Sequence, residues 1–213
     1  MQASAFSFCR LRLLLLGVGV AVLLPSCRDK ATDLAVTKAL TRAHDAHEHH
    51  DDDNALKYYD EAIQLDPDCA NAYGSRATIY AEVKQDYDRA IADYSEAIRL
   101  RDDQTAQGKY LAATVYTGRG HCYLHMAKVA EAIADYDEAI RLNPQVLQAY
   151  AYRGLAYETK GLYDKAIADY TEAIARTSDR PLYYKVRARV YRAAKQEAKA
   201  LKDERRARQL ERE

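Results

Sequence analysis

The chain contains little proline, two phenylalanines and no tryptophan. Proline numbers 4 in 213 residues, whereas tyrosine numbers 18 and charged residues make up 30%. Proline breaks helices most strongly, while long charged side chains are tolerated well in them. The composition therefore predicts an all-α protein, and its apolar content of 48% is enough for a substantial core.

Signatures of catalytic sites are also missing. The sequence has no G-x-S-x-G nucleophile motif, no phosphate-binding loop and no H-E-x-x-H zinc motif. The two cysteines beyond Cys27 are Cys69 and Cys122, which lie too far apart in the chain for a C-x-x-C metal motif and suggest no disulfide framework. We therefore predict no catalytic residue, no metal site and no cofactor.

The apolar run near the N-terminus is too short to cross a membrane. Leu13 to Leu24 follows Arg10 and Arg12, an order typical of a secretory signal peptide. As a helix this run would rise about 18 Å, against roughly 30 Å for the hydrocarbon core of a bilayer. Residues 1–26 are therefore predicted to be an export signal.

The residues that end this signal suggest an anchor. Leu24-Pro25-Ser26-Cys27 resembles the lipobox of bacterial lipoproteins, apart from its proline. The resemblance implies cleavage after Ser26 and lipid on Cys27, with Arg28 favouring an outer-membrane lipoprotein that faces the periplasm. Ordinary secretion is the alternative.

A nine-residue pattern recurs along the rest of the chain. Ala90 to Ile98 returns at 132–140 and 166–174 with one varying position, and 54–63 is a weaker copy. A period of about 34 residues is typical of a repeat architecture. Within each copy the apolar residues fall at i, i+4, i+7 and i+8, which predicts one buried helical stripe.

Each unit reads as two helices joined by a turn, as in Ala149–Tyr157, Gly161 and Ala166–Ile174. This pattern resembles the tetratricopeptide repeat over residues 36–213. The resemblance implies a right-handed α-solenoid after a short tether at 27–35. Its units would span 36–69, 70–104, 113–146, 147–180 and 181–213.

Local signals refine these units. We expect Asp33 to cap the first helix, and Gly120 and Gly154 to mark close helix crossings. Thr105 to Ala112 adds residues between two units, and we favour tolerated loop variation there over a helical extension or a lip beside the groove.

In the resembled family the first helices of successive units line a concave binding groove. Tyr152, Arg189 and Arg192 are the strongest contact candidates here, since hot spots are few and enriched in tyrosine and arginine. The competing interpretation is that most groove candidates are merely exposed helix faces. The full set is His44, His47, Thr78, Glu82, His121, His125, Tyr152, Glu158, Lys185, Arg189 and Arg192.

Histidines raise an alternative function. His44 to His50 contains four histidines before an acidic run at 51–53, and His121 precedes His125 by one helical turn. Two imidazoles on one turn make only half a metal site, so solvated polar surface is favoured over a metal-responsive periplasmic protein. Cys122 falls at a core position of the repeat, which favours a structural cysteine over a nucleophile.

Charge is distributed unevenly although the formal total is zero. Residues 28–104 carry 10 basic and 18 acidic side chains, 105–179 carry 8 and 9, and 180–213 carry 12 and 5. Such polarity would steer an oppositely charged partner or promote head-to-tail self-association.

These observations predict a lipid-anchored, non-catalytic scaffold or adaptor. It would bind envelope proteins or peptides, and the membrane through Cys27. Nucleic acid is not expected as a partner, because most of the tyrosines recur at repeat positions and belong to the core. A noncatalytic subunit of an envelope enzyme complex is a further alternative.

Overall fold

The computed structural model describes residues 11–16, 20–25, 30–101 and 104–212. Cys27, the predicted lipidation site, lies outside the described residues. Within those ranges, no helix combines the length and the apolar character that a membrane span requires.

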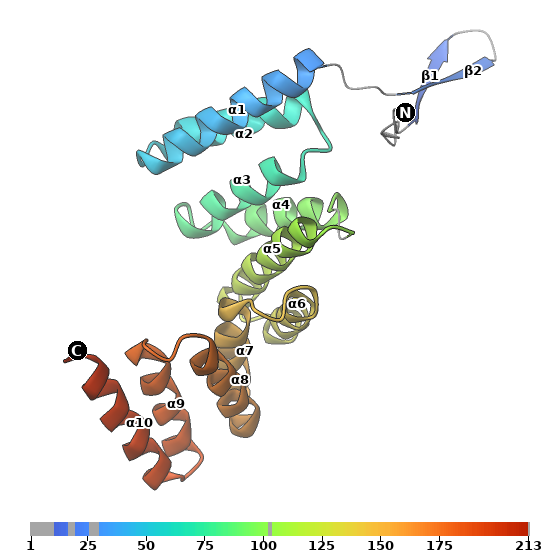
Figure 1. Cartoon of the computed structure of the whole chain (residues 1–213). Helices are drawn as coiled ribbons and strands as arrows, with labels where there is room; N and C mark the ends of the chain where they lie inside the picture. The colour runs from blue at the N-terminus through green and yellow to red at the C-terminus, as the bar shows by residue number, and fades with distance from the viewer. Residues whose placement is uncertain (1–10, 17–19, 26–29, 102–103, 213) are drawn as a thin grey trace, which may run out of the picture.

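The first described element is a β-hairpin. Strands β1 (Leu11–Leu16) and β2 (Val20–Pro25) pair antiparallel, with Leu11 opposite Pro25 and Leu16 opposite Val20. They contain most of the apolar run of the predicted export signal, which is therefore extended here rather than helical. Figure 1 shows the hairpin projecting away from the helices.

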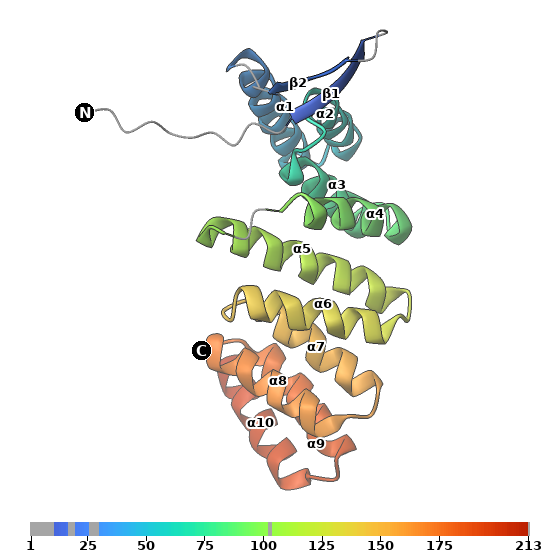
Figure 2. The same cartoon turned by 90° about the vertical axis from the view of Figure 1, so that its right-hand side faces the viewer.

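Ten α-helices follow in the described part of the chain and build a solenoid (Figures 1 and 2). Consecutive helices pack in pairs, and each pair packs on the next. The predicted all-α solenoid is confirmed. The helices are α1 (Lys30–Glu48), α2 (Asp52–Leu65), α3 (Ala70–Glu82), α4 (Tyr87–Arg99), α5 (Ala106–His125), α6 (Val129–Leu142), α7 (Leu147–Thr159), α8 (Tyr163–Arg176), α9 (Pro181–Ala193) and α10 (Glu197–Leu210).

Two helix starts differ from the sequence-based expectation. Helix α1 begins at Lys30, so Asp33 lies in its first turn rather than at its cap, and part of the predicted tether is helical. Helix α5 begins at Ala106, capped by the Thr105 hydroxyl, which accepts from Gly108 N at 2.9 Å. The favoured loop interpretation of Thr105 to Ala112 was therefore wrong: these residues lengthen α5, because a cap and several helix-forming residues precede its repeat positions.

The core is a layer of alanines and tyrosines between paired helices. On α4, Ala90, Tyr94, Ala97 and Ile98 are all buried, as the repeat pattern predicts. Tyr136 on α6 is fully buried, and its ring lies against the backbone of Gly120 on α5. A Cβ atom at Gly120 would lie 2.8 Å from Tyr136 Cε1, so this glycine sets how closely α5 and α6 approach.

The turn inside each unit is built on one residue with positive φ. His50, Gln85, Ala127, Gly161 and Lys195 have φ between 52° and 70°, and only one of them is glycine. A backbone hydrogen bond closes each turn, from Leu162 N to Tyr157 O at 2.9 Å in the fourth unit. In the second unit this bond runs from Asp86 N to Tyr80 O, so that turn is one residue longer.

A ladder of arginines, not recognised from the sequence, ties the units together. From α3 onward, the arginine of each first helix donates from Nε and Nη2 to both carboxylate oxygens of an aspartate on the second helix, at 2.7–2.9 Å. Between 6% and 11% of each aspartate side chain is exposed, so these are largely desolvated bidentate pairs. The arginine ladder consists of Arg76–Asp93, Arg119–Asp135, Arg153–Asp169 and Arg187–Asp203.

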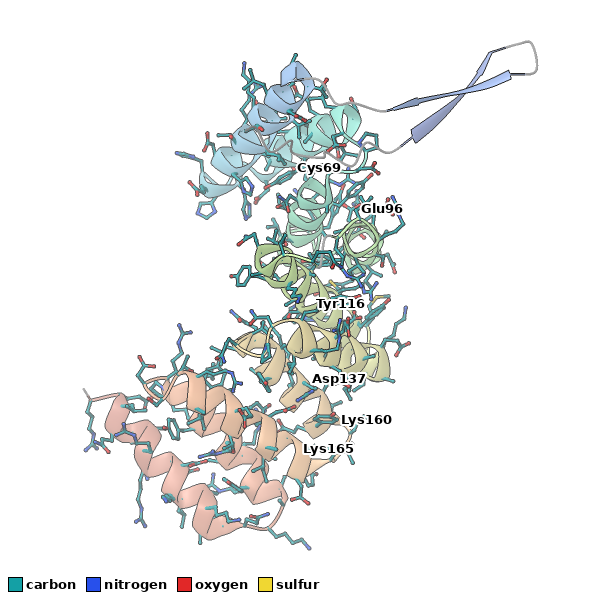
Figure 3. All side chains as sticks on the ribbon, turned by 45° about the vertical axis from the view of Figure 1, so that its right-hand side comes forward. Cys69, Glu96, Tyr116, Asp137, Lys160 and Lys165 are labelled. Carbon is teal, nitrogen blue, oxygen red and sulfur yellow. The ribbon has the colours of Figure 1, made fainter. Side chains whose placement is uncertain are left out.

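Each ladder arginine also reaches back to the preceding unit. Arg153 Nη1 donates to Asp137 Oδ1 on α6 at 2.6 Å, and Arg119 Nη1 donates to Ser95 Oγ on α4 at 3.0 Å. The Arg119 guanidinium lies 5.6 Å from the ring centre of Tyr116. Tyr116 and Asp137 are labelled in Figure 3. One side chain thus joins three helices of two units, which fixes how neighbouring units are stacked.

Candidate functional site

A groove of about 930 Å³ opens along α3, α5 and α7, the first helices of the three central units. Gly74 and Gly118 lie in its lining, and the ring of Tyr94 takes the space beside Gly118. The polar side chains along it are mostly uncharged, and Tyr110 and Leu111 from the extended start of α5 add apolar surface. The polar lining residues of the three helices include Asn71, Ser75, Thr78, Glu82, Gln107, Thr114, His121, Gln148 and Tyr152.

Gly118 lets Tyr94, which lies on α4, the second helix of its unit, reach this groove. A Cβ atom at Gly118 would lie 2.6 Å from Tyr94 Cζ and from its hydroxyl oxygen. The Tyr94 hydroxyl forms a hydrogen bond with Thr78 Oγ1 at 3.1 Å, and Thr78 Oγ1 donates to Gly74 O. Burial raises the pKa of Tyr94, so its hydroxyl remains protonated at neutral pH.

Equivalent tyrosines in the other units differ in what their hydroxyls contact. The Tyr59 hydroxyl lies 3.3 Å from His44 Nδ1, and the Tyr170 hydroxyl donates to Glu158 Oε2 at 3.3 Å. The buried hydroxyl of Tyr136 has no hydrogen-bond partner among the described residues. A buried, unsatisfied hydroxyl opposes folding, because it loses its hydrogen bond to water.

We therefore expect opposite responses to removing two of these hydroxyls. Tyr136→Phe should leave the free energy of unfolding unchanged or raise it by up to about 1 kcal/mol, while Tyr94→Phe should lower it by about 1 kcal/mol by breaking the bond to Thr78. Urea unfolding followed by circular dichroism measures both. A greater loss for Tyr136→Phe than for Tyr94→Phe would contradict this assignment.

Two tyrosines and two histidines form a continuous row across the end of α5, and His121 and Tyr152 of this row line the groove. His125 stacks on Tyr87 with ring centres 4.9 Å apart, His121 packs edge-on against His125 at 4.5 Å, and Tyr152 follows 4.9 Å from His121. The two Nε2 atoms of His121 and His125 lie 3.2 Å apart. Burial, and then His125, lower the pKa of His121, so this imidazole is neutral at neutral pH.

The histidine pair is the strongest point in favour of a metal site. However, no group of three or more histidine, cysteine, aspartate or glutamate side chains in the described ranges is placed to hold a metal ion. The pair supplies two ligands, and a structural zinc site takes four. The geometry therefore adds nothing to the metal-responsive alternative.

Cys122 is fully buried beneath this row and is not oxidised to a disulfide. Burial raises the pKa of its thiol to about 11. A thiol of this kind is protonated and inaccessible at neutral pH, and so is a poor nucleophile.

The structure brings only part of the predicted groove set together. Thr78, Glu82, His121 and Tyr152 line the central groove, and His125 lies beside His121. The other candidates lie outside this lining and are held by neighbours. His44 contacts Tyr59, His47 binds Asp52, Glu158 binds Arg189, Lys185 binds Glu211, and Arg192 binds both Glu197 and Glu204.

Several lining residues were missed from the sequence. Asn71, Thr114 and Gln148 lie one or two helical turns before predicted groove residues on the same helices, at i−7 from Thr78, i−7 from His121 and i−4 from Tyr152. Helical periodicity could have found them. The prediction instead favoured charged and aromatic residues at the C-terminal ends of these helices.

The charge asymmetry coincides with the long axis of the solenoid. Acidic excess falls in the segment that forms α1 to α4, and basic excess falls in α9 and α10 at the opposite end (Figure 2). Head-to-tail self-association between these ends stays a prediction.

Paired helices that repeat with a common turn, a common core stripe and an open concave side define a helical-repeat solenoid. A tetratricopeptide repeat model matches residues 40–106 and 117–181, so the chain belongs to the tetratricopeptide repeat family. Members of this family are protein-interaction modules, and this chain is accordingly a protein-interaction scaffold. Comparison with curated protein sequences finds no significant match.

Solved structures support the same fold. The chain is similar to the MamA protein, with 22% identity, a TM-score of 0.70, and coverage of 84% of this chain and 93% of that one. For YrrB, described as a tetratricopeptide protein with an unusual peptide-binding site, the identity is 20%, the TM-score 0.63 and the coverage 85% and 92%. For PilW, a type IV pilus biogenesis factor, the identity is 14%, the TM-score 0.70 and the coverage 82% and 77%.

Proposed function

We propose that the groove along α3, α5 and α7 binds an extended segment of a partner protein, and that the chain acts there without making or breaking a bond. The groove itself carries this proposal: it is open and long, and it is lined by hydroxyl, amide and aromatic groups suited to contacts with a peptide. The peptide-binding site described for YrrB, which shares the fold, is consistent with it.

Site-specific photo-crosslinking tests the groove. A photoreactive amino acid at Thr114, inside the groove, should capture a partner when the full chain is expressed in bacteria. The same residue placed at Lys165 on α8, which is exposed, lies outside the groove lining and is labelled in Figure 3, should capture none. Equal capture at both positions, or capture only at Lys165, would place the binding surface elsewhere.

We further propose that the chain is exported and held at a bacterial envelope membrane through lipid on Cys27, with partners among envelope proteins. Support comes from the sequence, in the basic residues Arg10 and Arg12, the apolar run after them and the Leu24-Pro25-Ser26-Cys27 motif. Metabolic labelling with a fatty acid should mark the wild type and not Cys27→Ala. Label that persists in Cys27→Ala would refute the anchor.

A further inference from the structure

Glu82 is a carboxylate in the lining of the groove. Two side chains in the lining carry a full charge at neutral pH, Glu82 and Arg101. Arg101 is occupied, because its Nη1 donates to Ile98 O at 3.0 Å and its guanidinium lies 5.6 Å from the ring centre of Tyr116. Among the described residues, Glu82 has neither a hydrogen bond nor an ion pair, and it is exposed to whatever enters the groove.

The other glutamate predicted for the groove, Glu158, differs from Glu82 in having a counter-ion. Glu158 belongs to α7 and accepts two hydrogen bonds from Arg189, at 2.9 Å and 2.8 Å. Its charge is therefore neutralised within the protein. Nothing equivalent reaches Glu82 from α5 or α7 in the part of the chain that the structure describes.

The surroundings of Glu82 suit a cation. Tyr152 lines the same groove, and burial, and next the charge of Glu82, raise the pKa of Tyr152. His121 packs against Tyr152 in the same groove and is neutral at neutral pH, so it does not neutralise Glu82. An ammonium or guanidinium group gains both from a carboxylate and from the face of an aromatic ring.

We propose that Glu82, in the groove that the Tyr152 ring also lines, is a subsite for a lysine or arginine side chain of the partner segment. This inference rests on the proposed function of the groove and deepens it by stating the chemistry of the occupant. An acidic segment would be repelled by the charge of Glu82. A wholly apolar one would remove the carboxylate from water unpaired, which is strongly unfavourable.

Peptide selection tests the subsite and does not require the partner to be identified. A displayed library of random dodecapeptides is selected in parallel on the wild type, on Glu82→Lys and on Glu131→Lys, which makes the same charge change at an exposed position of α6 outside the groove. Peptides enriched on the wild type and on Glu131→Lys should carry lysine or arginine at one fixed position. Those enriched on Glu82→Lys should lack it.

Affinity then measures the contact directly. Replacing that basic residue of a selected peptide by norleucine should weaken binding to the wild type about tenfold, equivalent to roughly 1.4 kcal/mol, and less than about twofold to Glu82→Gln. Circular dichroism confirms that the variants are folded.

The outcomes separate the two proposals. If peptides are enriched but show no basic preference, or keep that preference on Glu82→Lys, peptide binding stands and the subsite is wrong. If no peptide is enriched on any form, both the proposed function and the subsite are wrong. Self-association of the wild type that Glu82→Lys abolishes, without a peptide preference, would make a second copy the occupant and would also overturn the subsite.

Discussion

Replacing Asp169 by alanine is expected to lower the free energy of unfolding by about 3 kcal/mol. The substitution leaves the largely buried charge of Arg153 without its buried carboxylate partner. Arg153 has 18% of its side chain exposed and Asp169 6%, and two hydrogen bonds of 2.9 Å and 2.7 Å join them. The retained contact of Arg153 with Asp137 keeps the loss at the lower end of the range for broken buried pairs. Urea unfolding monitored at the helical signal measures it.

Asp137→Ala is the matched control, since Asp137 binds the same guanidinium from the other side. Its side chain is 54% exposed, and solvent screens its interaction with Arg153. We expect a loss of less than about 1 kcal/mol. Equal losses for the two variants would mean that burial of the aspartate does not determine the strength of the ladder.

Gly120→Ala is expected to lower the free energy of unfolding by about 2 kcal/mol, although alanine is the better helix former. The added Cβ would lie 2.8 Å from Tyr136 Cε1 and 3.1 Å from Cδ1, and Tyr136 is a fully buried ring with no room to move aside. Either the ring or the whole of α5 must shift. Thermal or urea unfolding detects the change.

The same substitution at Gly74 should have the opposite sign. A Cβ there would meet Val115 Cγ2 at 3.4 Å and Ala97 Cβ at 3.9 Å, which are ordinary contacts. We expect Gly74→Ala to stabilise the protein by about 0.5 kcal/mol through helix propensity. A destabilising Gly74→Ala together with a neutral Gly120→Ala would contradict the described helix crossing.

The repeat could be predicted because its signals are local. The spacing of Ala90, Tyr94 and Ala97 assigns both the helix and its buried face, and the repetition of the pattern assigns the architecture. The arginine ladder was also present in the sequence, as an arginine followed 16 or 17 residues later by an aspartate. What could not be seen is that these aspartates are buried, because a charged residue on a helix is usually at the surface.

The groove was predicted less completely, for a physical reason that Arg189 and Arg192 illustrate. Sequence position identified them as exposed bases on a first helix, and so as the best contact candidates besides Tyr152. The structure shows both already paired, Arg189 with Glu158 and Arg192 with Glu204. A charged side chain remains free only if no side chain of a neighbouring unit reaches it. The separation of two residues along the sequence does not show whether they are that close.

By itself, the sequence determined the helical repeat, its alanine and tyrosine core, and the opposite charge of the two ends, since these follow from composition and periodicity along one chain. Tertiary structure alone decided that Gly118 opens the groove to the Tyr94 hydroxyl, and that Glu82 has no partner there among the described residues. Each of these depends on the distance between helices, which is set by packing against the neighbouring unit.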